Sequence, residues 1–285
     1  MSSQSLELVS EHRCFDGQQR FYKHASQAVK GDMGFSVFIP PQAESGRVPV
    51  LMYLAGLTCT EETFMIKAGA QRLAAEAGIM LVAPDTSPRG NNLPGEDEDW
   101  DFGTGAGFYL DATQAPWNEH YRMESYVAHE LFDIVTSDLP GDAGRVGLFG
   151  HSMGGHGALV LAQRHRDKFT SVSAFAPVAA PSLCPWGQKA FHHYLGSDEA
   201  AWAAYDASRL MEQSQTPFPA GILIDQGLAD GFLKEQLYPE VFEAACETAK
   251  QPLTLRRHPG YDHGYYFIAT FMADHIAFHE KQLTA

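Results

Sequence analysis

The stretch Gly147–Gln163, GLFGHSMGGHGALVLAQ, places a serine between two glycines where two patterns meet. The apolar run Arg145–Phe149 before it is typical of a buried strand, and the small, apolar residues after it favour a helix. The spacing Gly-x-Ser-x-Gly around Ser152 is typical of a sharp strand-to-helix turn that projects a nucleophilic serine, because only small residues fit beside it. A plain glycine-rich turn with a capping serine is the alternative.

Strand and helix patterns alternate along the chain on both sides of this stretch. Apolar runs predict strands at 48–56, 79–85, 145–150, 169–177 and 220–227, of which the first two read as fully buried, and a further strand is expected at 253–260. Helical spacing predicts helices at 60–78, 126–139, 154–165, 238–250 and 266–283. This alternation predicts an α/β fold whose sheet is mostly parallel and doubly wound, with right-handed crossovers.

The first forty residues follow a different pattern. Short strand-like runs at 5–15, 19–26 and 33–41 are separated by the turn signals Asp16-Gly17 and Gly31-Asp32. They predict an N-terminal antiparallel β meander. Because no repeat or low-complexity linker divides the chain, we expect a single domain over residues 1–285.

Two long stretches, 86–121 and 179–219, show neither pattern. Insertions of this length inside a compact domain are usually functional or disordered, and these two are rich in the aromatic residues that disordered segments lack. We therefore expect ordered loops that roof a site at the carboxyl ends of the strands, where open α/β sheets bind ligands.

Composition narrows the classes of partner. The net charge of −15 argues against binding to nucleic acid or to an anionic membrane surface. No apolar run approaches the roughly 18 residues of a membrane span, and the N-terminus lacks the features of a signal peptide. The four scattered cysteines indicate free thiols in a reducing cytoplasm. The histidines form no HExxH motif or Cys/His cluster, so no metal is expected.

A serine nucleophile needs a base, and the base needs an acid that orients it. In α/β-hydrolases both follow the serine, on loops after later strands. His263 lies just before the last helix and is the expected base, whereas His258 lies inside a strand-like run. Of the two aspartates that follow the apolar run AGILI (220–224), Asp230 is expected to reach the base. Asp225 still belongs to the sheet edge, and we expect its carboxylate to bond loop backbone N–H groups.

An oxyanion needs two backbone N–H donors, one of them directly after the nucleophile. Met153 occupies that position. The second donor is expected from a loop after an earlier central strand, and Leu57, in the segment LAGLTCTEETF, is the residue we choose. An ordinary strand–helix connection is the alternative for that loop.

Six segments together carry a wider resemblance. They are LAGLTCTEETF (54–64), EDWDFGTGAGFYLDAT (98–113), GHSMGGHGAL (150–159), PWGQKAF (185–191), IDQGLADGFL (224–233) and YDHGYYF (261–267). With them, the chain resembles the S-formylglutathione hydrolase, or esterase D, family of the α/β-hydrolase superfamily, from about Cys14 to the last helix. No catalytic motif departs from the family pattern.

The resemblance implies an activity and a set of site residues. The reaction would be hydrolysis of S-formylglutathione to glutathione and formate in formaldehyde detoxification, by a cytoplasmic homodimer without a cofactor. It implies Ser152, Asp230 and His263 as the triad, with Leu57 and Met153 as oxyanion donors.

The family also has a cysteine near the site that is not the nucleophile, and Cys59 matches it. Trp186 and the aromatics of 100–109 are candidates to narrow the acyl pocket, with ordinary loop packing as the alternative. Lys67 and Arg89 are expected near the mouth, and a solvated surface charge is the favoured interpretation of each. A broad carboxylesterase for short acyl esters and a non-catalytic binding module are the alternative functions.

Overall fold

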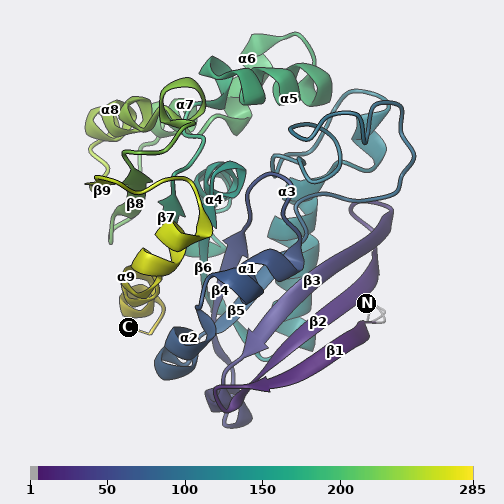
Figure 1. The fold of residues 1–285 in the computed structure, drawn as a ribbon, viewed down its shortest axis with the longest axis vertical. Helices are drawn as coiled ribbons and strands as arrows, with labels where there is room; N and C mark the ends of the chain where they lie inside the picture. Colours follow the sequence, from purple (N-terminus) through teal and green to yellow (C-terminus); the bar gives the residue numbers. More distant parts are fainter. Residues whose placement is uncertain (1–5, 285) are drawn as a thin grey trace.

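The computed structural model describes residues 6–284, which build a nine-stranded sheet (Figure 1). The order across the sheet is β1-β2-β3-β5-β4-β6-β7-β8-β9. In chain order the strands are β1 (Glu7–Cys14), β2 (Gly17–Ser26), β3 (Gly31–Ile39), β4 (Val48–Leu54), β5 (Met80–Pro84), β6 (Gly141–His151), β7 (Phe169–Phe175), β8 (Ile222–Gly227) and β9 (Leu253–His258).

The direction of the strands changes at β5. Strands β1, β2, β3 and β5 pair antiparallel, whereas β5, β4, β6, β7, β8 and β9 pair parallel. All nine predicted strands are present, and the predicted meander on a mostly parallel sheet is confirmed. The expected single domain over 1–285 includes residues 1–5 and 285, which lie outside the described residues, and it stays a prediction.

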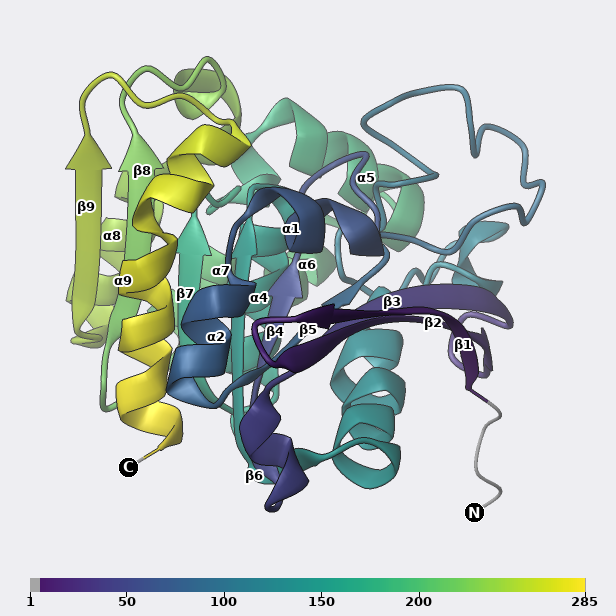
Figure 2. The same cartoon turned by 60° about the horizontal axis from the view of Figure 1, so that its bottom comes forward.

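Helices cover both faces of the sheet. The α-helices are α1 (Glu61–Lys67), α2 (Gln71–Ala77), α3 (Met123–Ser125), α4 (Met153–Arg164), α5 (Pro185–Leu195), α6 (Glu199–Trp202), α7 (Ala207–Glu212), α8 (Pro239–Ala249) and α9 (Tyr265–Leu283). Figure 2 shows α1, α2 and α9 on one face and α4 and α8 on the other. The core lies between these layers, and every residue of β4 and β5 is buried.

Two predicted helices differ in detail from the structure. The predicted helix at 60–78 is broken into α1 and α2, because Gly69 between them has a φ of +67°, which a helix does not accommodate. The predicted helix at 126–139 is present, but it is mostly π-helical, as η3 (Tyr126–Leu131) and η4 (Ile134–Asp138), and it continues from α3.

The expectation of an irregular stretch at 179–219 is wrong. This stretch contains α5, α6 and α7, each begun by a side chain that accepts a backbone N–H. The caps are Cys184, Asp198 and Asp206. These helices are too short to show a clear periodic pattern of apolar residues, so they were not predicted from the sequence. The stretch at 86–121, by contrast, is irregular apart from the 3₁₀ turn η2 (Trp117–Glu119).

The turn between β6 and α4 depends on the two glycines of the opening motif. Ser152 sits there at φ 57° and ψ −120°, a strained conformation for a residue with a side chain. A Cβ atom on Gly154 would lie 1.9 Å from the carbonyl oxygen of Leu54 in β4. A Cβ on Gly150 would lie 2.2 Å from the carbonyl oxygen of Gly154. The glycines are therefore required because backbones of β4, β6 and α4 meet at this turn.

Gly154→Ala should destabilise the protein strongly, because the new methyl group meets backbone that cannot rotate away. We expect a loss of more than about 3 kcal/mol in the free energy of unfolding, or failure to fold. Gly144→Ala is the control, since its Cβ would meet only the Asp142 carboxylate, at 3.4 Å. Urea denaturation compares the two, and equal stabilities would contradict the packing described for the turn.

Candidate active site

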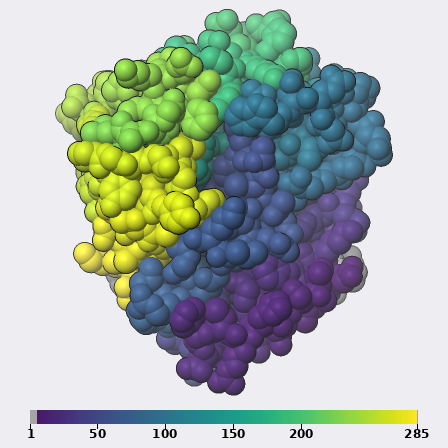
Figure 3. Space-filling view, viewed as in Figure 1, coloured from purple at the N-terminus to yellow at the C-terminus, as the bar shows by residue number. Residues whose placement is uncertain are grey.

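A cavity of about 140 Å³ surrounds the serine of the turn. Six residues predicted for the site line it: Ser152, His263, Leu57, Cys59, Trp100 and Trp186. Figure 3 shows the surface hollowed where the blue, green and yellow segments meet over this region. The structure thus brings together residues that lie more than two hundred positions apart in the chain.

Backbone contacts fix Ser152 at the floor of the cavity. Its N–H donates to the carbonyl of Phe175 (3.0 Å), and its carbonyl accepts from the N–H groups of His156 (3.0 Å) and Val178 (3.1 Å). The serine precedes the first residue of α4, Met153, and the first N–H groups of a helix have no intrahelical acceptor. The Met153 N–H is thus placed at the positive end of the helix dipole.

The loop after β4 approaches the serine from the other side. A Cβ on Gly56 would lie 3.2 Å from the Ser152 Cβ and 3.4 Å from the His151 carbonyl oxygen. Glycine at this position therefore lets the loop pass directly beside the nucleophile. This places Leu57, the predicted second oxyanion donor, in the wall of the same cavity.

His263 is bound to Asp230 as predicted. Its Nδ1 lies 2.6 Å from the Asp230 Oδ2, and the carboxylate is buried. Because a carboxylate only accepts, Nδ1 carries the proton and Nε2 keeps its lone pair for a hydroxyl proton. Asp230 also accepts from the Phe232 N–H (2.8 Å) and from the Gln226 amide (3.3 Å). These bonds orient the carboxylate toward the imidazole.

A second histidine, His151, packs against the base. Its ring centroid lies 4.4 Å from that of His263. Burial, with a smaller effect of the nearby His263, holds the pKa of His151 well below its usual value. His151 is therefore neutral at pH 7 and does not oppose a positive charge on the base.

Asp225 has different partners from those predicted. Within residues 6–284 its buried carboxylate accepts no loop N–H. Instead it accepts from Arg256 (2.6 and 2.5 Å), His258 (3.1 Å) and His275 (3.2 Å). Arg256 and His258 belong to β9, which leads into the loop of His263, and His275 belongs to α9, which leads out of it. Asp225 thus ties together the two elements that flank the base. The spacing of residues in the sequence could not predict that the Asp225 carboxylate binds side chains of the neighbouring strand.

His275 begins a buried chain of hydrogen bonds that holds α9 on β7. Its Nδ1 lies 2.8 Å from the Ser173 hydroxyl, which lies 2.8 Å from the His279 Nε2. The His279 Nδ1 lies 2.7 Å from the Ser171 hydroxyl. Burial lowers the pKa of both histidines, so they are neutral. With each Nε2 protonated, every bond has one donor and one acceptor, and the chain ends on Asp225.

Aromatic rings form one wall of the cavity. Trp186 contacts Trp100 edge to face, with ring centroids 5.6 Å apart, and it contacts Phe232 at 4.7 Å. Phe232 in turn contacts the His263 ring at 5.0 Å. Each of the two long insertions thus supplies one tryptophan. Phe232 and Tyr265 were missed, although each lies two residues after a predicted catalytic residue.

Of the other aromatic candidates near Trp100, none lines the cavity. Phe102 packs on Trp117 and Tyr194, Phe108 is buried, and the Tyr109 hydroxyl donates to the Ala55 carbonyl (2.9 Å). The expectation that these three narrow the pocket is wrong. All three instead belong to the buried core of the protein.

Cys59 lies in the cavity wall as a thiol of low reactivity. Burial raises its pKa, against the smaller effects of Thr63, Tyr265 and the charge of Lys67. It is therefore protonated at neutral pH, and a protonated thiol is a poor nucleophile.

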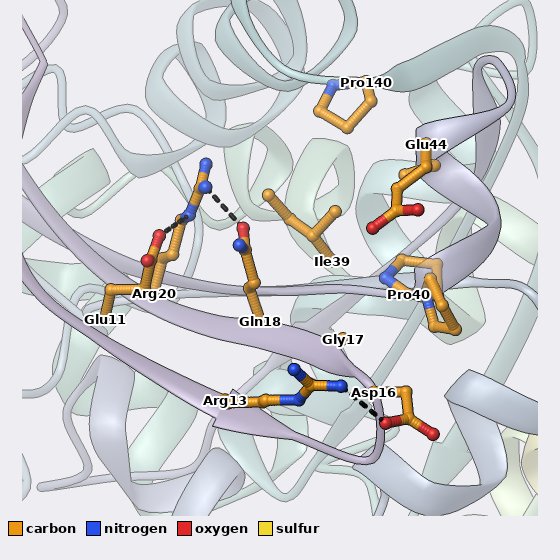
Figure 4. A pocket seen from close by; sticks show the side chains of 12 residues that line it. Glu11, Arg13, Asp16, Gly17, Gln18, Arg20, Ile39, Pro40, Glu44 and Pro140 are labelled. Carbon is orange, nitrogen blue, oxygen red and sulfur yellow. Dashed lines mark hydrogen bonds and ion pairs between the residues drawn. The ribbon is translucent and has the colours of Figure 1, made fainter.

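A larger cavity, of about 370 Å³, lies on the meander (Figure 4). Both of its arginines already pair with carboxylates, Arg13 with Asp16 (3.0 Å) and Arg20 with Glu11 (2.6 Å). None of the described residues that line it is a serine, cysteine or histidine. It therefore offers no nucleophile, and size alone does not mark the site.

Comparisons with known proteins agree with this geometry. The esterase family model matches residues 26–278. S-formylglutathione hydrolase from Rattus norvegicus is 52% identical over 98% of this chain and 99% of its own length. The enzyme of that name from Paracoccus denitrificans is 51% identical, with 98% and 99% covered. The chain belongs to the S-formylglutathione hydrolase family.

A solved structure of a family member shows that the fold is shared over nearly the whole chain. The S-formylglutathione hydrolase from Agrobacterium tumefaciens superimposes with a TM-score of 0.94 at 48% identity, over 97% of this chain and 99% of that one. The predicted α/β-hydrolase fold is confirmed. Within residues 6–284 no helix is long and apolar enough to cross a membrane, and no three potential ligands converge on a metal position.

Asp230→Asn should preserve the fold and lower kcat by about 10⁴, because the amide no longer fixes the tautomer of His263 or stabilises its positive charge. Asp225→Asn should act mainly on stability, by about 1–3 kcal/mol, since it leaves buried donors without an acceptor. Steady-state kinetics and thermal denaturation on both variants separate these roles. An active Asp230→Asn beside a stable but inactive Asp225→Asn would reverse the assignment of the two aspartates.

Proposed function

We propose that the protein hydrolyses S-formylglutathione to glutathione and formate, with Ser152 as nucleophile, His263 as base and Asp230 as the acid that orients the base. The observation that carries this proposal is the 2.6 Å contact between His263 Nδ1 and Asp230 in the cavity that also contains Ser152. Membership of the S-formylglutathione hydrolase family supports the choice of substrate.

In the first half of the reaction the formyl group passes to the enzyme. His263 Nε2 takes the proton of the Ser152 hydroxyl as its oxygen attacks the formyl carbon. The Leu57 and Met153 N–H groups stabilise the oxyanion that forms. Collapse of the intermediate breaks the carbon–sulfur bond and releases glutathione as a thiolate, which is a good leaving group and needs little help from an acid. His263 then passes the serine proton to the departing sulfur or to solvent, so that it is neutral again when water arrives.

In the second half water replaces glutathione. His263 takes a proton from the water as it attacks the formyl ester, and the same two N–H groups stabilise the second oxyanion. The proton then returns from His263 to the Ser152 oxygen as formate leaves. The aromatic wall of Trp186 and Phe232 limits the space beside the acyl carbon, which favours the smallest acyl group.

Three further attributes belong to the same proposal. The protein works as a homodimer in the cytoplasm, without a cofactor, as the resemblance to the family implies. A broad carboxylesterase would use the same triad and differs only in its preference among substrates. A binding module would have no need of an oriented base beside a strained serine.

Ser152→Ala should fold normally and lose catalysis by about 10⁴–10⁶, because the covalent step is removed. Cys59→Ser is the control for a thiol mechanism and should stay active. Purified variants are assayed with S-formylglutathione and with p-nitrophenyl acetate. Preference of the wild type for the thioester supports the proposed substrate, and equal turnover of both supports the carboxylesterase. An inactive, folded Cys59→Ser beside an active Ser152→Ala would overturn the triad.

The homodimer is checked separately by light scattering coupled to size-exclusion chromatography. The measured mass should be twice the 31.3 kDa of the chain. A mass of one chain across the working range of concentrations would contradict this part of the proposal.

A further inference from the structure

The cavity is too small for the whole of the proposed substrate. Its volume of about 140 Å³ accommodates the thioester end, whereas pockets that enclose a drug-sized ligand occupy about 300–1,000 Å³. The peptide part of glutathione, with its two carboxylates and one ammonium group, must therefore lie on the surface around the mouth. Recognition of glutathione depends on charged groups at that rim.

The rim has a basic residue that is free to bind an anion. Lys67, the last residue of α1, is exposed, and its ammonium lies over the ring of Tyr265, 5.7 Å from the centroid. Tyr265 lines the cavity. Among residues 6–284 no carboxylate lies within ion-pair distance of this ammonium, although twelve other lysines and arginines have such a partner.

Two other basic residues near the site, Arg89 and Lys189, are already engaged. Arg89 binds the Asp85 carboxylate through two nitrogens, at 2.6 and 2.9 Å, and it also donates to the Cys59 carbonyl. Lys189, on the helix of Trp186, binds Asp99 and Asp101, both at 2.7 Å. A substrate carboxylate would have to displace these partners, whereas at Lys67 it would displace no carboxylate of the described residues.

We propose that Lys67 binds a carboxylate of the glutathione moiety and so makes the enzyme selective for glutathione thioesters over neutral esters; this rests on the proposed function. An unpaired lysine at the mouth matters for substrate binding because the protein as a whole is strongly negative. Glutathione carries a net negative charge and the protein carries −15, so the distant field repels the substrate. A single unpaired ammonium beside the mouth opposes that field where the substrate binds. The ring of Tyr265 beneath it holds the ammonium near the cavity.

The test separates glutathione binding from chemistry. Lys67→Met should raise the KM for S-formylglutathione about five- to tenfold and leave its kcat unchanged within about twofold, because a charge-assisted contact of modest strength is lost. Lys67→Arg should restore the wild-type KM, and p-nitrophenyl acetate should be hydrolysed equally by all three proteins. Arg72→Met removes the same charge from α2, where Arg72 pairs with Glu76, and is the control for net charge.

An inert ligand makes the result independent of turnover of the thioester. S-methylglutathione should inhibit p-nitrophenyl acetate hydrolysis, and Lys67→Met should weaken this inhibition by the same factor as it raises KM. The diethyl ester of S-methylglutathione, which has no free carboxylate, should inhibit the variant and the wild type equally. Equal KM and inhibition constants in Lys67→Met and wild type would overturn the proposal for Lys67. A wild type that binds S-methylglutathione but does not cleave S-formylglutathione would instead contradict the proposed function.

Discussion

The structure depends on a close approach of three backbones, those of β4, β6 and α4, at the turn that carries Ser152. The position that a Cβ of Gly154 would occupy lies 1.9 Å from the Leu54 carbonyl oxygen, so no other residue fits there. This approach forces Ser152 into its strained conformation and places the start of α4 beneath it. It also brings the loop of Gly56 and Leu57 alongside Ser152. One packing constraint therefore sets the positions of the nucleophile and of both proposed N–H donors.

The base is held in place by two aspartates with different tasks. Asp230 contacts the imidazole of His263 directly, whereas Asp225 lies in β8 and binds residues of β9 and α9 on either side of the loop. Because α9 is also anchored through His275, Ser173 and His279, the loop of the base is fixed at both ends. His263 therefore lies on a loop, but the elements on either side hold that loop rigid, and a preformed catalytic geometry requires this.

Much of this could be predicted from the sequence, because buried parallel strands are continuous apolar runs and the turn around Ser152 has a local signature. The rest depends on contacts between distant segments. The partners of Asp225 lie on the neighbouring strand and helix, and nothing in the spacing of IDQGLADGF shows them. The helices of 179–219 were not predicted because they are short, and so they lack a long run of apolar residues at helical spacing. Phe232 and Tyr265 reach the cavity only because the loops of Asp230 and His263 fold together over Ser152.

The most direct test of the account is to identify the residue that carries the acyl group during turnover. The enzyme is mixed with p-nitrophenyl acetate, quenched in acid within one turnover, digested and analysed by mass spectrometry. The account predicts one acetyl group on the peptide that contains Ser152, and its accumulation in Asp230→Asn, where water is activated poorly. An acetyl group on the peptide of Cys59, or no covalent adduct at any quench time, would contradict it.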